Sequence, residues 1–147
     1  MGTDIYVEET EDGKVVDFLR WSIGNYHGFN VELAKFVQHA LVHYIQPSLL
    51  ISNNHPDIHL YSAQTYGLPW IFAIDELLPD GGYKINWEIA KNRIVFLNKF
   101  MSSELNTLYD KEPYTRKRMV AELDYIERFI NNIMNSEYKQ RPLVWSM

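Results

Sequence analysis

Two long segments with helical apolar spacing, joined by a short connection, constrain the fold of this chain more than any other feature. The first runs from about residue 86 to 109 and the second from about residue 113 to 135. In each, apolar side chains recur at steps of three and four residues, which places them along one face of a helix. The two seams consist of Trp87, Ala90, Ile94, Leu97, Met101, Leu105 and Leu108, and of Met119, Leu123, Ile126, Ile130 and Ile133. Because the connection is short, the two helices are predicted to pack as an antiparallel hairpin.

The first of these helices carries a second apolar ridge, formed by Ile85, Ile89, Phe96 and Phe100. A helix that is apolar on two sides is normally covered on two sides. We therefore expect Trp87, Phe96 and Phe100 to lie in the core. The second ridge also leaves room for a partner chain, and a homodimer is one arrangement that this pattern allows.

The N-terminal residues predict a β-hairpin. Two β-prone runs, residues 4–9 and 14–19, flank Glu11-Asp12-Gly13. The Asp-Gly pair supplies the positive φ angles that a tight hairpin turn requires. This part of the chain is expected to form two adjacent antiparallel strands.

After the hairpin, the chain is expected to form a loop and then a helix. Gly24 and Gly28 act as helix breakers between Ser22 and Asn30, and Asn30 is a favourable N-cap residue. Pro47 is predicted to end the helix. Its buried face should consist of Leu33, Phe36, Val37, Ala40, Leu41 and Tyr44.

The middle of the chain, residues 47–79, is rich in turn residues and contains two short β-like runs, 58–61 and 70–74. Either strands or an ordered loop fits this pattern. The tail, residues 141–145, is apolar enough to dock back as an edge strand or a clamp. Together these segments predict a single α+β domain over residues 1–147. In this fold a small antiparallel sheet, made of the N-terminal hairpin and short central strands, packs on three helices.

The composition limits the chemistry that is open to the chain. It contains no cysteine, which excludes disulfide frameworks, thiolate zinc sites and thiol nucleophiles. No apolar run approaches the roughly 20 residues that span a bilayer. Acidic residues follow the N-terminus, where a secretory signal would carry positive charge. We therefore expect a cytoplasmic protein without a membrane partner.

The net charge of −5 is spread unevenly along the chain. Residues 1–20 hold six acids against two bases, whereas residues 111–147 hold seven bases against five acids. A protein that binds duplex nucleic acid normally shows a basic footprint across the whole domain. Duplex nucleic acid is therefore not an expected partner, whereas a local anion site stays open.

The segment from His55 to Trp70 has the composition of a contact loop. Histidines, an aspartate, an amide and aromatic rings are interspersed there with turn residues, and binding residues are concentrated on such loops. We predict that His59, Tyr61, Tyr66 and Trp70 form a surface that contacts another protein or a small ligand.

Two histidines, His39 and His43, are candidate metal ligands. They lie four residues apart, the spacing at which a helix presents two side chains to one metal ion. Further candidate ligands are Asp4, His27, Glu32, His55, Asp57 and His59, and no spacing demands any of them. In the competing interpretation, His39 and His43 simply lie at the border between the apolar and polar faces of the helix.

A basic cluster surrounds the predicted start of the last helix. Lys111, Arg116, Lys117 and Arg118 occur within eight residues, with Tyr114 between them. Bases in a first helical turn oppose the helix dipole, which favours anions there. Guanidinium groups next to the free amides of a helix start would hold a phosphate, and Tyr114 would stack on a base. The alternative is a solvated charged surface.

The opening Met1-Gly2-Thr3-Asp4-Ile5, with Val7-Glu8 after it and Asn25-Tyr26 before Phe29, resembles a family of small phage and bacterial proteins. These proteins begin Met-Gly-x-Asp-Ile-His, continue with a Tyr-Val-Glu-like strand and carry Arg-Asn-Tyr-x-x-Phe before their first helix. Here Tyr6 replaces the family's His, and no Arg precedes Asn25. The likeness covers about the first thirty residues. It implies a prokaryotic or phage setting rather than a reaction.

Three functions are consistent with these patterns. We place first a non-enzymatic binding protein, phage-encoded and acting on a host protein through residues 55–70. The second is a phosphate- or nucleotide-sequestering protein that binds a small anionic ligand at Tyr114, Arg116, Lys117 and Arg118. The third is a metal-dependent hydrolase that uses the histidines. No Gly-rich phosphate loop, nucleophile elbow or dinucleotide fingerprint is present, so no cofactor is expected.

Overall fold

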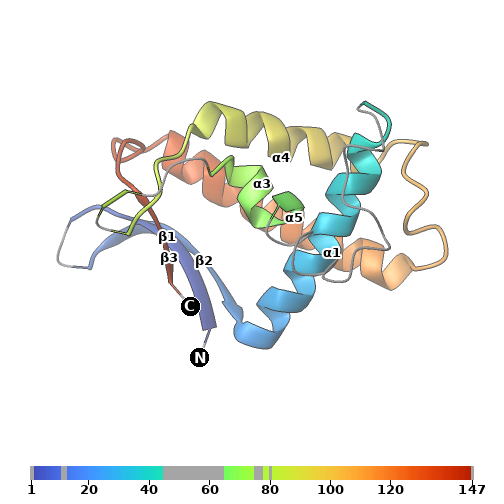
Figure 1. The fold of residues 1–147 in the computed structure, drawn as a ribbon, viewed down its shortest axis with the longest axis horizontal. Helices are drawn as coiled ribbons and strands as arrows, with labels where there is room; N and C mark the ends of the chain where they lie inside the picture. Colours follow the sequence, from blue (N-terminus) through green and yellow to red (C-terminus); the bar gives the residue numbers. More distant parts are fainter. Residues whose placement is uncertain (1, 11–12, 45–64, 75–77, 80, 147) are drawn as a thin grey trace.

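The computed structural model describes residues 2–10, 13–44, 65–74, 78–79 and 81–146. Within these residues the fold is α+β, as predicted, with a three-stranded antiparallel sheet and four helices (Figure 1). The strands are β1 (Gly2–Glu8), β2 (Val15–Ser22) and β3 (Leu143–Ser146). The helices are α1 (Ile23–Leu41), α3 (Leu68–Phe72), α4 (Trp87–Met101) and α5 (Pro113–Met134).

The predicted N-terminal hairpin is present as strands β1 and β2. In β1, every second side chain is buried, starting from Thr3 and continuing through Ile5 and Val7. The register pairs Thr3 with Trp21 and Ile5 with Leu19, and both partners are buried too. Since neighbouring residues of a strand point to opposite faces, this register directs one apolar face of the sheet towards the helices.

The third strand is the C-terminal tail, as the edge-strand prediction allowed. It pairs with β1, so the sheet order is β2-β1-β3 and β1 is central. Ile5 lies opposite Trp145, and Val7 lies opposite Leu143. On the side of β3 that faces away from β1, Leu143 forms two backbone hydrogen bonds of 2.9 Å with Tyr83. These bonds hold the C-terminal tail on its second edge.

The predicted β-like run at 70–74 is helical instead, and the run at 58–61 lies outside the described residues. Helix α3 begins at Leu68, whose backbone N–H donates to the Asn30 side-chain oxygen at 2.7 Å. Pro69 follows, and proline is favoured in a first helical turn. The helix ends at Phe72, and its C-cap residue Ala73 has a left-handed φ of 51°. These contacts at the two ends stabilise a short helix, although the β-propensity of residues 70–74 favoured a strand.

Helix α1 starts eight residues before the predicted position, so the expected loop from Ser22 to Asn30 is wrong. The Ser22 hydroxyl caps the helix by accepting from the backbone N–H of Asn25 at 3.4 Å. Gly24 and Gly28 both lie inside the helix. A glycine in a helix costs only about 1 kcal/mol relative to alanine. Burial of apolar side chains on this first part of α1 offsets that cost.

The helical hairpin is confirmed: α4 and α5 run antiparallel, and α5 returns along α4 (Figure 1). Helix α4 nevertheless ends at Met101, earlier than the predicted residue 109. The Met101 carbonyl accepts from the Asn106 side-chain amide at 3.0 Å and from the Arg116 guanidinium at 3.1 Å. These bonds satisfy a terminal carbonyl and let the chain turn, so Leu105 is 48% exposed rather than part of the seam.

The core lies between the buried face of the sheet and the helices. Trp87 and Phe100 are buried as expected, whereas Phe96 is half-buried. The second ridge of α4 is therefore only partly covered, and Ile89 remains 40% exposed. In the part of the chain that the structure describes, no helix is both long and apolar enough to cross a membrane.

Candidate functional site

Only part of the predicted contact loop lies among the described residues. His55, Asp57, His59 and Tyr61 fall outside them. Tyr66 is half-buried and packs against the core just before α3. Trp70 lies within α3 and is half-buried at the surface.

Trp70 borders a shallow groove where the end of α1, helix α3 and the first half of α4 meet. We call it the Trp70 groove, and its volume is about 360 Å³. It is lined by Leu41, Tyr44, Trp70, Ile89, Asn92, Arg93 and Phe96. Tyr44 is 64% exposed and Ile89 is 40% exposed. The groove is therefore an apolar surface with aromatic walls that is open to solvent.

The walls of the Trp70 groove are held by specific contacts. The Arg93 guanidinium lies over the Trp70 ring, 4.7 Å from the ring centroid, and also donates to the Trp70 backbone carbonyl. On the opposite side, the Tyr44 ring meets Phe96 edge to face, with centroids 5.4 Å apart. Each of these contacts reduces the conformational freedom of a large side chain. Tyr, Trp and Arg are also the residues enriched at binding hot spots.

The residues Tyr44, Ile89 and Arg93 were not predicted as binding residues. A signal for Ile89 existed, because it belongs to the second apolar ridge of α4. Arg93 carried no signal, since its role depends on Trp70, which lies 23 residues earlier. The groove is thus a product of packing between three helices.

The two candidate metal ligands, His39 in α1 and His43 just beyond its C-terminal end, pack against neighbouring rings. The His39 and His43 rings meet edge to face with centroids 5.9 Å apart, and both rings lie against Phe100. The His39 Nε2 atom accepts a hydrogen bond from the backbone N–H of Thr107 at 3.3 Å. This hydrogen bond links α1 to the connection between α4 and α5. It supports the interpretation that His39 lies at the border between the apolar and polar faces of the helix.

Asp4 and Glu32, two of the other candidate ligands, each lie beside a cationic side chain. Asp4 forms an ion pair with Arg20 at 2.7 Å on the sheet, and Glu32 lies 3.8 Å from Lys35 on α1. Among the described residues, no group of three His, Asp or Glu side chains has an arrangement that would hold a metal ion.

The residues of the basic cluster at the start of α5 differ in their contacts and in their exposure to solvent. Arg116 donates to the Met101 carbonyl, so it acts as a link between α4 and α5. Arg118 lines a different cavity, between α1 and α5, of about 320 Å³. Tyr114 is 73% exposed, and Lys117 is exposed as well. Arg116 and Arg118 therefore contribute to different parts of the surface.

The cavity beside Arg118 has the wrong charge for a phosphate. Glu32 and Glu122 also line it, which sets two carboxylates against one guanidinium. The Glu122 carboxylate accepts from the Trp21 indole N–H at 2.9 Å, so it is held in place there. These two carboxylates would repel a negatively charged phosphate placed in the cavity. This cavity suits a cation better than a nucleotide.

Two buried tyrosines have perturbed pKa values. Burial raises the pKa of Tyr26 to about 12. Burial also raises the pKa of Tyr109 above its ordinary value, and the neighbouring Glu32 carboxylate adds to this effect. Both hydroxyls therefore stay protonated over a wider pH range than an exposed tyrosine does.

Comparison of the chain with protein-family models, with curated proteins and with solved structures found no match.

Proposed function

We propose that this chain is a non-enzymatic binding protein whose Trp70 groove receives apolar side chains of another protein. The observation that carries the proposal is the exposure of Tyr44 and Ile89 beside Trp70. Isolated exposed apolar residues are ordinary, but a contiguous apolar patch with a polar rim is typical of interaction surfaces. Here three elements contribute to one such patch.

The shape of the groove favours a protein as the partner. Sites for small molecules are usually concave enough to enclose most of the ligand. The Trp70 groove is shallow and follows the direction of α4, so it fits a row of side chains from a helix or an extended segment. Arg93 supplies the positive charge at its rim, which would pair with a carboxylate or a carbonyl of that partner.

A bacterial host protein is the expected partner under this proposal. The support is the resemblance of the first residues to small phage and bacterial proteins, beginning with Met1-Gly2-Thr3-Asp4-Ile5. The groove supports a protein partner, and the resemblance supports only the bacterial setting of that partner. A binding test in bacterial lysate addresses both.

The test replaces an exposed groove residue by a charged one. Ile89→Asp places a carboxylate in the apolar groove, and Val120→Asp makes the same change at a residue of α5 that is similarly exposed, at 44%. Partners retained from lysate by the original chain are identified and purified, and their affinities are measured by calorimetry. Ile89→Asp should weaken binding by about thirtyfold, the effect of losing a hot-spot residue. Val120→Asp should leave the affinity unchanged.

A second variant, Trp70→Ala, removes the ring on which Arg93 rests and should also weaken the same partner. Circular dichroism establishes that each variant is folded before its affinity is compared. Retention of no partner by the original chain would contradict the proposal. Equal affinities for the original chain and Ile89→Asp would contradict it as well.

A further inference from the structure

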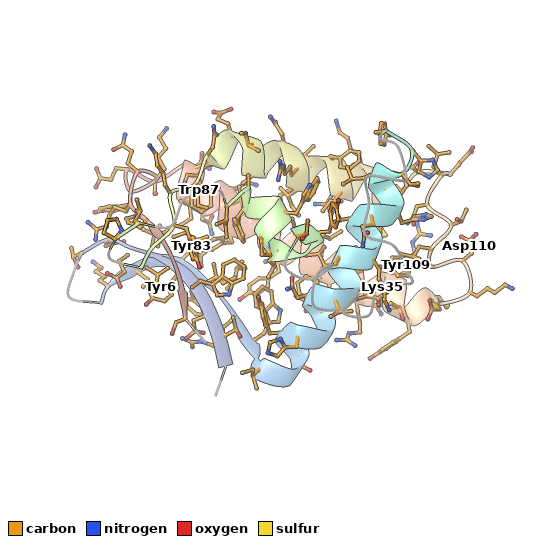
Figure 2. The ribbon with its side chains drawn as sticks, viewed as in Figure 1. Tyr6, Lys35, Tyr83, Trp87, Tyr109 and Asp110 are labelled. Carbon is orange, nitrogen blue, oxygen red and sulfur yellow. The ribbon has the colours of Figure 1, made fainter. Side chains whose placement is uncertain are left out.

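The sheet has a second face, which points away from the helices. In β1 the residues that alternate with the buried ones, Asp4, Tyr6 and Glu8, lie on this face. Figure 1 shows the helices on the other side of the strands, and Figure 2 labels Tyr6 beside the strands. We call this surface the outer sheet face. None of its residues lines the Trp70 groove.

An apolar row crosses the outer sheet face. The register places Phe18 of β2 and Val144 of β3 opposite Tyr6 of β1. Side chains that lie opposite each other on neighbouring strands share one face of the sheet, with Cβ atoms about 5 Å apart. Phe18 is 40% exposed, and Tyr6 and Val144 are half-buried. These three side chains therefore form one continuous apolar surface across three strands.

The largest exposed ring of this row is held in place. The Arg20 guanidinium lies over the Phe18 ring, 4.6 Å from the ring centroid. Its Nε donates to the Asp4 carboxylate at 2.7 Å, so the arginine is itself anchored to β1. A partner that covers Phe18 would lose less conformational entropy than on a freely rotating ring.

Both edges of the sheet already have partners, so the outer face is more accessible than the edges. At the edge of β2, the Arg20 backbone N–H donates to the Tyr125 hydroxyl at 3.1 Å, and this hydroxyl donates to the Phe18 carbonyl at 3.5 Å. At the edge of β3, Leu143 pairs with Tyr83. A partner strand that joined either edge would have to displace these contacts.

The charge of the outer sheet face favours a basic partner. Residues 1–20, which supply β1 and most of β2, hold six acids against two bases. On the face itself Asp4 is paired with Arg20, whereas Glu8 has no ion pair within the described residues. A lysine or arginine of a partner would therefore complement Glu8.

A second copy of this chain fits the outer sheet face poorly. If two outer faces met around a two-fold axis parallel to β1, Asp4 would oppose Asp4 and Glu8 would oppose Glu8. If the axis crossed the strands at Tyr6, Asp4 would oppose Glu8. Either arrangement sets carboxylates against each other, which is unfavourable. The same carboxylates would repel the phosphates of a single nucleic-acid strand stacked on the rings.

We propose that the outer sheet face is a second docking surface, which binds an amphipathic helix with basic residues from another protein. A helix with its side chains is about 10 Å wide, and three strands spaced about 4.8 Å apart offer a face of similar width. The apolar side of the helix covers Phe18, Tyr6 and Val144, and one of its basic residues pairs with Glu8. This surface does not depend on the Trp70 groove, because the strands supply none of the groove residues.

Two synthetic peptides test this assignment by two-dimensional NMR of the backbone amides. One is an amphipathic helix of leucine and lysine, and the other has glutamate in place of every lysine. The leucine–lysine peptide should shift the amide signals of Tyr6, Phe18 and Val144. The leucine–glutamate peptide should leave them in place. The signals of Ile89 and Phe96 report separately on the Trp70 groove.

Variants locate the contact. Phe18→Ser should weaken the leucine–lysine peptide by about tenfold, and Val120→Ser is the matched control, since Val120 is 44% exposed on α5. Glu8→Gln should weaken the peptide by about threefold, because it removes one partly exposed charge contact. Glu104→Gln, at an exposed glutamate between α4 and α5, should bind as the original chain does.

Several results would overturn the proposal. One is that the millimolar leucine–lysine peptide leaves the sheet signals in place, or shifts only those of Ile89 and Phe96. Another is that Phe18→Ser binds this peptide as tightly as Val120→Ser does. Shifts of Tyr6 and Phe18 that grow with protein concentration, without any peptide, would assign the face to a second copy of this chain instead.

Discussion

At the scale of single residues, several polar side chains that look like ligands turn out to join elements of the fold. Asn30 was expected to cap its own helix, but its side chain accepts from Leu68 and caps α3 instead. His39 accepts from the Thr107 backbone. Arg116 closes the end of α4. Asn30 was predicted to bind a backbone group, whereas His39 was a candidate metal ligand and Arg116 a candidate phosphate ligand. The backbone partner of each lies in another part of the fold.

Asn30→Ala should destabilise the protein measurably. The Asn30 side chain is 7% exposed, and its removal leaves the buried Leu68 N–H without this acceptor. The expected loss is about 1–3 kcal/mol of unfolding free energy, measured by urea denaturation. Asn92→Ala, at an exposed position of α4, is the control and should change stability by less than about 0.5 kcal/mol. Equal stabilities for the two variants would show that the cap contributes nothing.

At the scale of elements, two glycines have different structural roles, one inside helix α1 and one beside the C-terminal tail. A Cβ added at Gly28 would meet nothing within 4 Å, so this glycine is a tolerated interruption of α1 rather than a helix end. A Cβ at Gly82 would lie 2.6 Å from the Pro142 Cβ, so the tail can pass only if that position lacks a side chain. The same residue type therefore has opposite structural meanings at the two positions.

Gly28→Ala and Gly82→Ala should shift stability in opposite directions. Alanine at Gly28 improves the helical propensity without a clash, which should stabilise the protein by about 1 kcal/mol. Alanine at Gly82 pushes Pro142 away, and the pairing of Tyr83 with Leu143 should weaken. Thermal unfolding followed by circular dichroism measures both changes. A rise in melting temperature for Gly82→Ala would contradict this account of the tail.

At the scale of the whole molecule, the two ends of the chain complete one sheet. Strand β1 lies between β2 and the C-terminal strand β3, and Figure 1 shows both termini at the same end of the sheet. Trp145 of β3 then reaches the helices, with its ring 6.3 Å from those of Tyr26 and Phe72. Stability of the sheet therefore depends on contacts between residues at opposite ends of the sequence.

Leu143→Ala should test this dependence. Leu143 is fully buried, and truncation of a buried leucine costs about 2–5 kcal/mol. Val144→Ala, at the next residue and only half-buried, should cost less. Hydrogen exchange should be faster at the β1 amide that faces β3, that of Tyr6, for Leu143→Ala than for Val144→Ala. The stability of each variant is measured by urea denaturation followed by circular dichroism. Equal midpoints of unfolding for the two variants would contradict the prediction.

The sequence by itself determined those elements whose apolar residues repeat regularly within one continuous segment. The hairpin of α4 and α5, the two N-terminal strands and the docking of the tail follow from spacing, turn residues and composition, because these patterns report which face each element buries. Helix boundaries near Gly24 and Ser102 could not be placed in this way, since small differences in local propensity are decided by caps and packing partners.

Only the tertiary structure decided where the candidate sites lie. The Trp70 groove requires the end of α1, helix α3 and α4 to meet, and the cavity beside Arg118 requires α1 and α5 to lie side by side. Neither arrangement leaves a spacing in the sequence, because the residues involved belong to separate elements. A surface site depends on which elements become neighbours, and the burial of the core determines that for the chain as a whole.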